Sequence, residues 1–388
     1  MKKFTFAFLA ILGFSSAVSA ADLYVRDFGA GGAYATISAA ITAAADGDRI
    51  IIKPKAGGIP YLENLVIDKS LTLVSETNFA KYLVQGSVTI TPAPGRVVTI
   101  NNLNCTSGII TAATIGGRTT INVLNSIMFD VVAYYSNTTL NISGCAVTQS
   151  IYFTHGKCIA NACLGIYVSN ILGITTTDSN LATEDIEIIA NKISGVLDMN
   201  QRNYNFKILN NYSFGGSYFN IAGVKLNGNN EIRNNYINTT SISVAIYINL
   251  PTGNTAVISV LNNIIIGSSK IQSSGVASVY AFYNMSNTAF NAVNLTSASN
   301  NVGSATFTAN NSTFTVTGAN VNAGYPDDEY ADLDLSLNDI GNFGGSNSWA
   351  NYWPTAVGNK PQVNYLNTPR RIYSGTTTLN AVGSGYSK

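Results

Sequence analysis

A short motif recurs through the middle of the 388-residue chain, and its spacing constrains the fold more than any other feature. In this motif an apolar residue is followed by two variable residues, an asparagine, one further residue and a second apolar residue. Its copies are Ile188-x-x-Asn191-x-Ile193, Ile232-x-x-Asn235-x-Ile237 and Val260-x-x-Asn263-x-Ile265, and Ile208-x-x-Asn211 matches the first half. The apolar runs are too short for helices, so the motif indicates short strands separated by a recurring bend.

The repeat extends toward the N-terminus with other residues in the asparagine position. Ser126 and Cys145 occupy that position in frames of the same kind, and Cys105 and Cys163 match it more loosely. Successive positions are separated by 18 residues at the closest, from 145 to 163, and by 28 at most, as from 163 to 191. This repeat length, without the signatures of leucine-rich repeats or propellers, predicts the coils of a parallel β-solenoid.

Asparagine suits the corner of such a coil for two reasons. It tolerates the left-handed backbone conformation that a sharp bend between two strands requires. Because stacked strands lie about 4.8 Å apart, its side chain can also hydrogen-bond to the same residue in the next coil. The sequence therefore predicts a structural ladder formed by Asn191, Asn211, Asn235, Asn263, Cys105, Cys145 and Cys163.

The N-terminal part contains one helix pattern. Ile37, Ala40, Ile41 and Ala44 form an apolar stripe at helical spacing, and an apolar strand pattern follows at 49–53. With the repeat, this arrangement resembles bacterial secreted proteins of the pectate-lyase-like superfamily. The resemblance covers roughly 24–345 and implies an all-β, right-handed parallel β-helix whose first coil is capped by the N-terminal helix.

The first twenty residues resemble an export signal, with Lys2 and Lys3 before an apolar core and Val18-Ser19-Ala20 at the end. We expect a signal peptide at 1–20, a β-helix domain at 21–345, and a C-terminal tail or the start of a further β module at 346–388. Export through the inner membrane of a Gram-negative bacterium would deliver the chain to the periplasm, the cell surface or the medium. No later stretch is apolar over the roughly 20 residues that a spanning helix needs, so we expect no membrane span in the mature chain.

Charge is scarce in this chain. Only 11% of residues are charged and the net charge is +1, which gives no basic surface for nucleic acid. We expect a non-catalytic protein that binds a polysaccharide or acts as an adhesive or structural component of the cell surface. Surfaces rich in amides, hydroxyls and aromatic rings suit sugars, because the rings stack on the apolar faces of sugar rings.

One enzymatic alternative follows from the resemblance. Polysaccharide lyases of this superfamily remove a proton beside a uronate carboxylate, using a basic side chain while a cation neutralises the acid. The stretch IEIIANKISG resembles the strand that carries the catalytic lysine of alginate and chondroitin lyases, which would make Lys192 the base, assisted by Arg202, Lys207 or Arg233. These residues must converge on one face of the coil for the alternative to hold; otherwise they are solvated surface charges.

A single histidine and a C-terminal acidic motif complete the candidates. His155 lies in a Thr-His-Gly segment similar to that of polygalacturonases, but the two carboxylates that such hydrolysis needs are missing upstream, so we expect a turn or surface residue.

Residues 325–345 resemble a segment that closes many bacterial secreted β-helix proteins. Asp332, Asp334 and Asp339 could bind Ca²⁺ there, or could hold the turns of a terminal cap, and no other cofactor is expected.

The four cysteines leave two alternatives open. Buried free thiols are the expectation, because cysteine fills space as a small apolar side chain. A disulfide between Cys145 and Cys163 is the other, since these two residues fall on adjacent coils of the repeat.

Overall fold

The computed structural model describes residues 20–77, 80–113, 117–135, 137–169, 183–239, 242–275, 277–310 and 312–353, two strands at 361–367 and 382–387, and residues 375, 378, 380 and 381. The predicted signal peptide, apart from Ala20, lies outside the described residues. No helix in the described part of the chain is long and apolar enough to cross a membrane.

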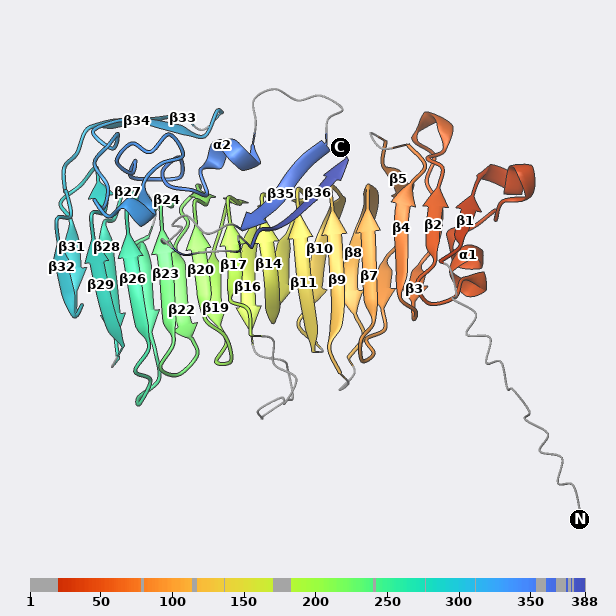
Figure 1. Cartoon of the computed structure of the whole chain (residues 1–388), viewed down its shortest axis with the longest axis horizontal. Helices are drawn as coiled ribbons and strands as arrows, with labels where there is room; N and C mark the ends of the chain where they lie inside the picture. The colour runs from red at the N-terminus through yellow and green to blue at the C-terminus, as the bar shows by residue number, and fades with distance from the viewer. Residues whose placement is uncertain are drawn as a thin grey trace, which may run out of the picture.

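The chain winds into a rod of stacked coils whose strands form three faces (Figure 1). The first face is a sheet of 13 strands in parallel register. Its strands, in order along the rod, are β1 (Asp22–Val25), β2 (Arg49–Ile52), β4 (Leu71–Ser75), β7 (Val97–Asn101), β9 (Thr119–Leu124), β11 (Thr138–Ser143), β14 (His155–Ile159), β17 (Ile186–Ile189), β20 (Phe206–Leu209), β23 (Asn229–Arg233), β26 (Val257–Leu261), β29 (Ser278–Phe282) and β32 (Ser297–Ser299).

After a tight bend, each coil contributes a strand to the second face and then one to the third. The second face contains β5 (Tyr82–Val84), β8 (Leu103–Thr111), β10 (Ile127–Ala133), β12 (Ala146–Val147), β15 (Ala162–Cys163), β18 (Lys192–Ile193), β21 (Tyr212–Ser213), β24 (Tyr236–Asn238), β27 (Ile264–Ile266) and β30 (Met285–Ser286). The third face contains β3 (Leu65–Ile67), β6 (Val88–Ile90), the second halves of β8 and β10, β13 (Ser150–Phe153), β16 (Gly165–Ser169), β19 (Leu197–Asn200), β22 (Phe219–Gly223), β25 (Ile246–Asn249), β28 (Lys270–Ser274) and β31 (Asn291–Val293).

Strands β8 and β10 turn the corner between the second and third faces, which joins these two faces into one parallel sheet of 19 strands. The predicted all-β fold, a parallel β-helix, is therefore confirmed. The domain boundary expected at 345 stays a prediction, although the stacked strands themselves end at Ser299.

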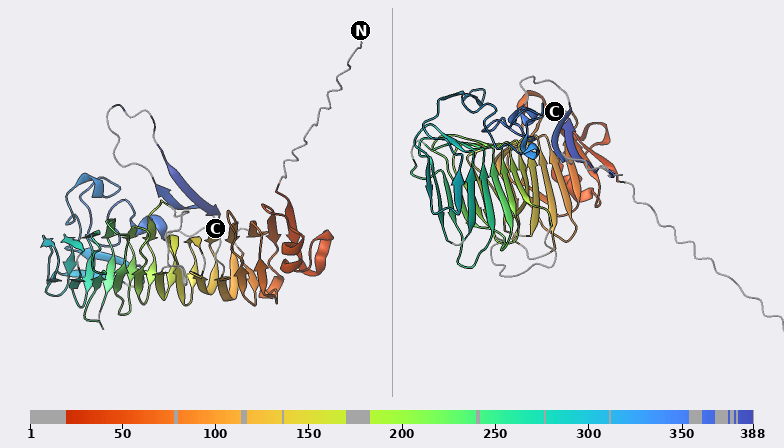
Figure 2. Two further views of the ribbon diagram at one scale, coloured as in Figure 1. Left: turned by 90° about the horizontal axis from the view of Figure 1, so that it is seen from below. Right: turned by 60° about the vertical axis from the view of Figure 1, so that its left-hand side comes forward.

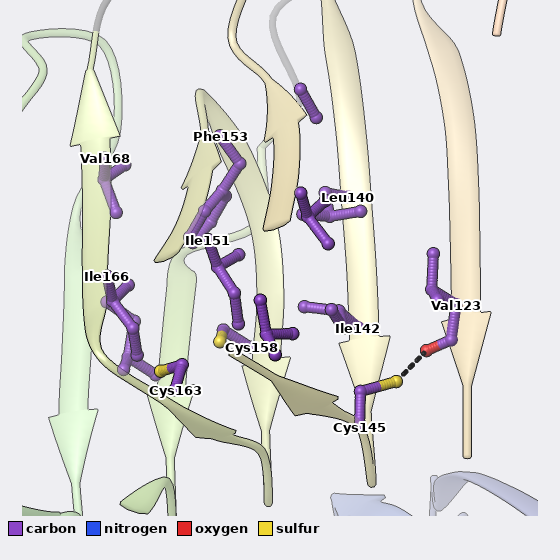
Figure 3. Packing of buried hydrophobic residues seen from close by; sticks show 14 of the residues in the cluster. Val123, Leu140, Ile142, Cys145, Ile151, Phe153, Cys158, Cys163, Ile166 and Val168 are labelled. Atoms are coloured by element: carbon purple, nitrogen blue, oxygen red, sulfur yellow. Dashed lines mark hydrogen bonds between the residues drawn. The ribbon is translucent and has the colours of Figure 1, made fainter. Parts of the chain in front are cut away.

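The core is a set of columns in which like residues stack coil upon coil. One column runs through Val123, Ile142, Cys158, Ile188 and Ile208, which are aligned in register and at most 1% exposed. Figure 3 shows part of this packing. Branched aliphatic side chains fill such columns well, because they are stiff at χ1 and suit a pleated surface.

Helix α1 (Ile37–Ala43) confirms the predicted N-terminal cap. Its buried residues, Ile37, Ala40 and Ile41, pack against β1, β2 and β3 and so cover the first coil. A charged side chain binds each end of the helix. At the N-terminus, Glu63 accepts hydrogen bonds from the backbone N–H groups of Ile37 and Ser38. At the C-terminus, Lys69 donates to the carbonyls of Ile41 and Ala44. An acid at the N-terminus and a base at the C-terminus complement the helix dipole.

The paired asparagines of each corner have separate structural roles. The first residue of the pair takes the left-handed conformation, with φ of 54° at Asn210, 55° at Asn234 and 54° at Asn262. Ala160, Ala190 and Tyr283 take it at equivalent corners, so the bend requires this conformation whichever residue is present. The second residue points inward and forms the ladder.

In the ladder, each side-chain amide donates to the Oδ1 of the next coil at 2.9–3.0 Å. Each Oδ1 also accepts the backbone N–H of the ladder residue in the preceding coil. The described members of the row are Asn161, Asn191, Asn211, Asn235, Asn263, Asn284 and Asn301.

Of the cysteines assigned to the ladder, only Cys145 lies there. Its backbone N–H donates to Asn161 Oδ1 at 3.0 Å, and its Sγ accepts the N–H of Ser126. The assignment was wrong for Cys163, which pairs with Ile193, two positions after Asn191. It was also wrong for Cys105, which pairs with Met128, two positions after Ser126. Residues two apart on a strand face the same side, so a slip of two keeps the apolar pattern and misleads the alignment.

All four cysteines are buried free thiols, as the first alternative expected. Figure 3 shows Cys145, Cys158 and Cys163 among the aliphatic side chains of the core. Burial raises the pKa of the Cys145 and Cys163 thiols to about 12, so they stay protonated and act as apolar filler.

After β32 the chain leaves the stack and runs back along the flank of the rod (Figures 1 and 2). This flank segment, residues 305–353, contains the antiparallel hairpin β33 (Phe307–Asn310) and β34 (Thr315–Gly318), a short turn at Asp328–Tyr330, and α2 (Trp349–Tyr352). The terminal cap predicted for 325–345 was wrong in its position, because the segment lies against the corners of earlier coils. Farther on, β35 (Pro361–Asn367) and β36 (Val382–Ser387) form an antiparallel pair.

Candidate functional site

The flank segment is held by the outward asparagines of the corners. The side-chain amide of Asn210 donates to the carbonyls of Asn342 and Gly344, at 3.1 and 2.7 Å. The amides of Asn234 and Asn262 both donate to Asn338 Oδ1, at 2.9 and 3.0 Å. All of these asparagines are 0% exposed, so the contacts form a buried polar seam between the segment and the rod.

An apolar cluster lies beside this seam. Tyr212 and Tyr236 stack with ring centroids 4.3 Å apart, and Phe314 and Trp349 of the flank segment pack against Tyr212. Trp349 is 2% exposed. Burial of such large aromatic side chains, worth roughly 1.5–3 kcal/mol each, fixes the segment to the rod.

Lys192, the base of the lyase alternative, is covered by the same segment. Its Nζ lies 3.9 Å from the ring centroid of Phe314 and 3.9 Å from that of Trp353. Burial lowers the pKa of Lys192. The half-buried lysine therefore makes cation–π contacts at the interface between the rod and the flank segment.

The other lyase candidates do not join Lys192. Lys207 and Arg233 lie on the first face, Lys192 lies on β18 of the second face, and Arg202 is exposed in the connection from β19 to β20. Lys207 and Arg233 thus share one face, while Lys192 and Arg202 each lie in another part of the coil. The convergence that a lyase site requires is not present in this arrangement.

The charges of the first face form a row that alternates in sign. Lys157, Glu187, Lys207 and Glu231 are aligned on successive coils. Lys157 and Glu187 lie 3.1 Å apart, and Lys207 is 3.0 Å from Asp185. Opposite charges on neighbouring strands stabilise a sheet modestly, which is a sufficient structural reason for the row.

The acids of the C-terminal motif hold turns. Asp332 accepts the backbone N–H groups of Asp339 and Gly345, Asp334 accepts from Ser336, and Asp339 accepts the N–H of Asn322. Within the part of the chain that the structure describes, no group of three or more His, Cys, Asp or Glu is placed to hold a metal ion. The arrangement gives the Ca²⁺ prediction no support beyond the residue types.

A groove of about 520 Å³ lies between the first face and the flank segment. Its polar lining includes Lys207, Asn229, Glu231, Arg233, Glu329 and Tyr330. We call it the flank groove.

Three contacts fix the lining of the flank groove. Arg233 donates from Nε to Glu231 Oε1 at 2.6 Å, and its guanidinium carbon lies 5.0 Å from the ring centroid of Tyr330. Burial, together with the hydrogen bond to Glu329, raises the pKa of Tyr330, so its hydroxyl stays protonated. The groove therefore offers carboxylates, a guanidinium, an ammonium and amides within one small space.

The third face carries a row of tyrosines on its outer side. The rings of Tyr152 and Tyr167 stack at 4.8 Å between centroids with an interplanar angle of 14°, and Tyr134 lies 5.6 Å from Tyr152. These three side chains are half-buried. They form a continuous aromatic surface over neighbouring coils.

Polar residues continue the same row along the rod. In register after Tyr167 come Asp198, Asn220 and Tyr247. Asn220 donates to Asp198 Oδ1 at 3.1 Å, and burial raises the pKa of Asp198. We call the row of Tyr134, Tyr152, Tyr167, Asp198, Asn220 and Tyr247 the tyrosine strip.

His155 is buried, so the expected turn or surface position was wrong. Its Nε2 donates to the carbonyl of Glu184 at 3.0 Å, and its ring lies 4.3 Å from that of Tyr204. Nδ1 accepts hydrogen bonds from Thr139 or Arg118, and burial lowers the pKa of the imidazole. His155 is thus a neutral structural residue at the start of β14.

Sequence reasoning missed both the tyrosine strip and the flank groove. The ladder positions alone do not align the strip, because Tyr152 lies seven residues after Cys145 whereas Tyr167 lies six residues after Asn161, although the two tyrosines pair in the sheet. The groove was not detectable either, because Glu329 and Tyr330 meet Glu231 only when a segment about a hundred residues later folds back. Comparisons with protein-family models, with curated proteins and with solved structures find no match for this chain.

Proposed function

We propose that this chain is an exported β-helix protein of the pectate-lyase-like type that binds a polysaccharide without cleaving it, at or outside the cell surface. The observation that carries the proposal is the tyrosine strip, an aromatic and polar row along the outer side of the third face.

The chemistry of the strip suits a sugar chain. The apolar faces of sugar rings stack on tyrosine rings, and sugar hydroxyls pair with amides and carboxylates. Tyr152 and Tyr167 supply the rings, and Asp198 and Asn220 supply oxygen acceptors and amide donors on the coils that follow. Because successive coils add about 4.8 Å each, the strip follows the rod axis and fits an extended polymer better than a compact ligand.

The same residues favour binding over catalysis. Asp198 is the one carboxylate of the strip, and its Oδ1 is engaged by Asn220 at 3.1 Å. Glycoside hydrolysis needs a second convergent carboxylate, and β-elimination needs an accessible base. Lys192 packs against Phe314 and Trp353 of the flank segment, which argues against its use as that base. A surface-structural or adhesive role through the bound polymer is consistent with this arrangement.

Affinity electrophoresis of residues 21–388 through gels containing neutral or uronate polysaccharides tests the proposal. We expect retardation by at least one polymer, without the ultraviolet absorbance of unsaturated sugar ends that a lyase produces. New absorbance would make the protein an enzyme, and migration unchanged by every polymer would contradict polysaccharide binding.

A further inference from the structure

The flank groove is separate from the tyrosine strip, because the groove lies beside the first face of the rod and the strip lies on the third face. We propose that the flank groove is a second binding site, for a short, uncharged, polyhydroxylated ligand such as the end or a branch of a neutral oligosaccharide. The inference does not depend on binding at the strip.

The charges of the groove argue for an uncharged ligand. Each base already faces an acid: Arg233 lies 2.6 Å from Glu231, and Lys207 lies 3.0 Å from Asp185. Glu329 adds a further carboxylate to the lining. An anion would meet these acids, and a cation would meet Arg233 and Lys207. A hydroxyl group both donates and accepts, so a polyol can bond to carboxylate and guanidinium together.

The groove is also held in shape before any ligand arrives. Arg233 is 7% exposed and lies between Glu231 on the rod and the Tyr330 ring on the flank segment. Asn338, which bridges Asn234 and Asn262, also donates to the carbonyl of Tyr330. These contacts fix the far wall of the groove, and a fixed wall lowers the entropy lost on binding.

Size and lining agree with a small ligand. The volume of about 520 Å³ falls within the range of roughly 300–1,000 Å³ that small-molecule sites occupy. The Tyr330 ring supplies an apolar element beside the polar groups. Sites for sugars combine such a ring with directional polar groups.

Titration calorimetry with short sugars tests this site. The probes are cellotetraose, maltotetraose, xylotetraose and laminaritetraose as neutral tetrasaccharides, and tetragalacturonate as the charged one. We expect at least one neutral tetrasaccharide to bind and tetragalacturonate to bind more weakly. Failure of all four neutral sugars, or tighter binding of tetragalacturonate, would overturn the inference.

Substitutions locate the binding. Glu329→Gln and Tyr330→Ala are expected to weaken the neutral sugar by about tenfold or more, because they remove an acceptor and the ring. Tyr330→Phe keeps the ring and should retain more affinity than Tyr330→Ala. Glu187→Gln is the matched control, since Glu187 belongs to the same charged row but lies outside the groove.

Thermal unfolding of each variant shows whether it is folded. If folded Glu329→Gln and Tyr330→Ala proteins bind as tightly as the unchanged chain, the sugar binds elsewhere and the inference fails. Polymer retardation in gels is a separate measurement, so its outcome leaves this test intact.

Discussion

The side-chain amide of Asn211 donates to Asn235 Oδ1 at 2.9 Å, while the same Oδ1 accepts the backbone N–H of Asn211 at 2.9 Å. Asn235 in turn donates to Asn263 and to the carbonyl of Ile208. Asn235 thus ties its coil to both neighbouring coils, and its amide also donates to the carbonyl of Arg233 in its own bend. All of these atoms are buried, so none of the bonds can be replaced by water at no cost.

Asn235→Ala should therefore lower the free energy of unfolding by about 2 kcal/mol or more, because the buried backbone N–H of Asn211 loses its acceptor and Asn263 Oδ1 loses one of its two donors. Denaturant unfolding measures the change. Asn141→Ala is the matched control: Asn141 also donates to an asparagine of a neighbouring coil, Asn122 of the preceding one, but it lies half-exposed on the outer side. An equal loss in both variants would show that burial of the ladder does not matter.

Asn338→Ala should loosen the flank segment. The substitution removes the acceptor shared by Asn234 and Asn262, which leaves two buried amides without that partner. We expect limited proteolysis to cut within 305–353 several-fold faster than in the unchanged chain, while the rod resists cleavage. Cleavage at an unchanged rate would mean that the apolar cluster alone holds the segment.

Stability should fall as the pH drops below about 6.5, the ordinary pKa of histidine. Burial lowers the pKa of His155 in the folded chain, so below this pH the unfolded chain binds a proton that the folded chain does not. The loss approaches about 1.4 kcal/mol per pH unit until the folded-state pKa is reached.

His155 is the only histidine of the chain, which makes the effect easy to isolate. Unfolding measured between pH 7 and 5, in the unchanged chain and in His155→Gln, should show a steeper slope when the histidine is present. Equal slopes would contradict the buried neutral imidazole.

The four cysteine thiols should be inert toward a thiol reagent in the folded protein and should all react after unfolding in denaturant without reductant. Burial raises the pKa of each thiol, and each is at most 7% exposed. Fewer than four reactive thiols after unfolding would reveal a disulfide.

The fold was predictable from the sequence because its cause is local and repeated. An asparagine two residues before a buried isoleucine marks one corner, as at Asn191 and Ile193, and the pattern needs no long-range information. The N-terminal helix was predictable for the same reason. The register failed at Cys163, where Asn161 holds the ladder position two residues earlier, and at Cys105, where Leu103 occupies that position in place of an asparagine.

The sites were less predictable because they depend on distant contacts. Lys192 looked available as a base, and only the folding back of Phe314 and Trp353 covers it. Likewise, sequence reasoning assigned Asn210 and Asn234 no role of their own, whereas in the structure they anchor the flank segment. The repeat pattern of the sequence predicts neither the contacts of Lys192 with the flank segment nor the anchoring of that segment by asparagines.

The most direct test of polysaccharide binding along the third face compares variants in the most retarding gel. Tyr152→Ala with Tyr167→Ala removes the stacked pair of the strip, and Tyr280→Ala removes an outward, half-exposed tyrosine of the first face. We predict that the paired substitution weakens the affinity for the polymer by about tenfold or more, while Tyr280→Ala leaves it unchanged. Each sugar ring stacked on a tyrosine contributes on the order of 1 kcal/mol. Undiminished retardation of the folded paired variant would contradict the account.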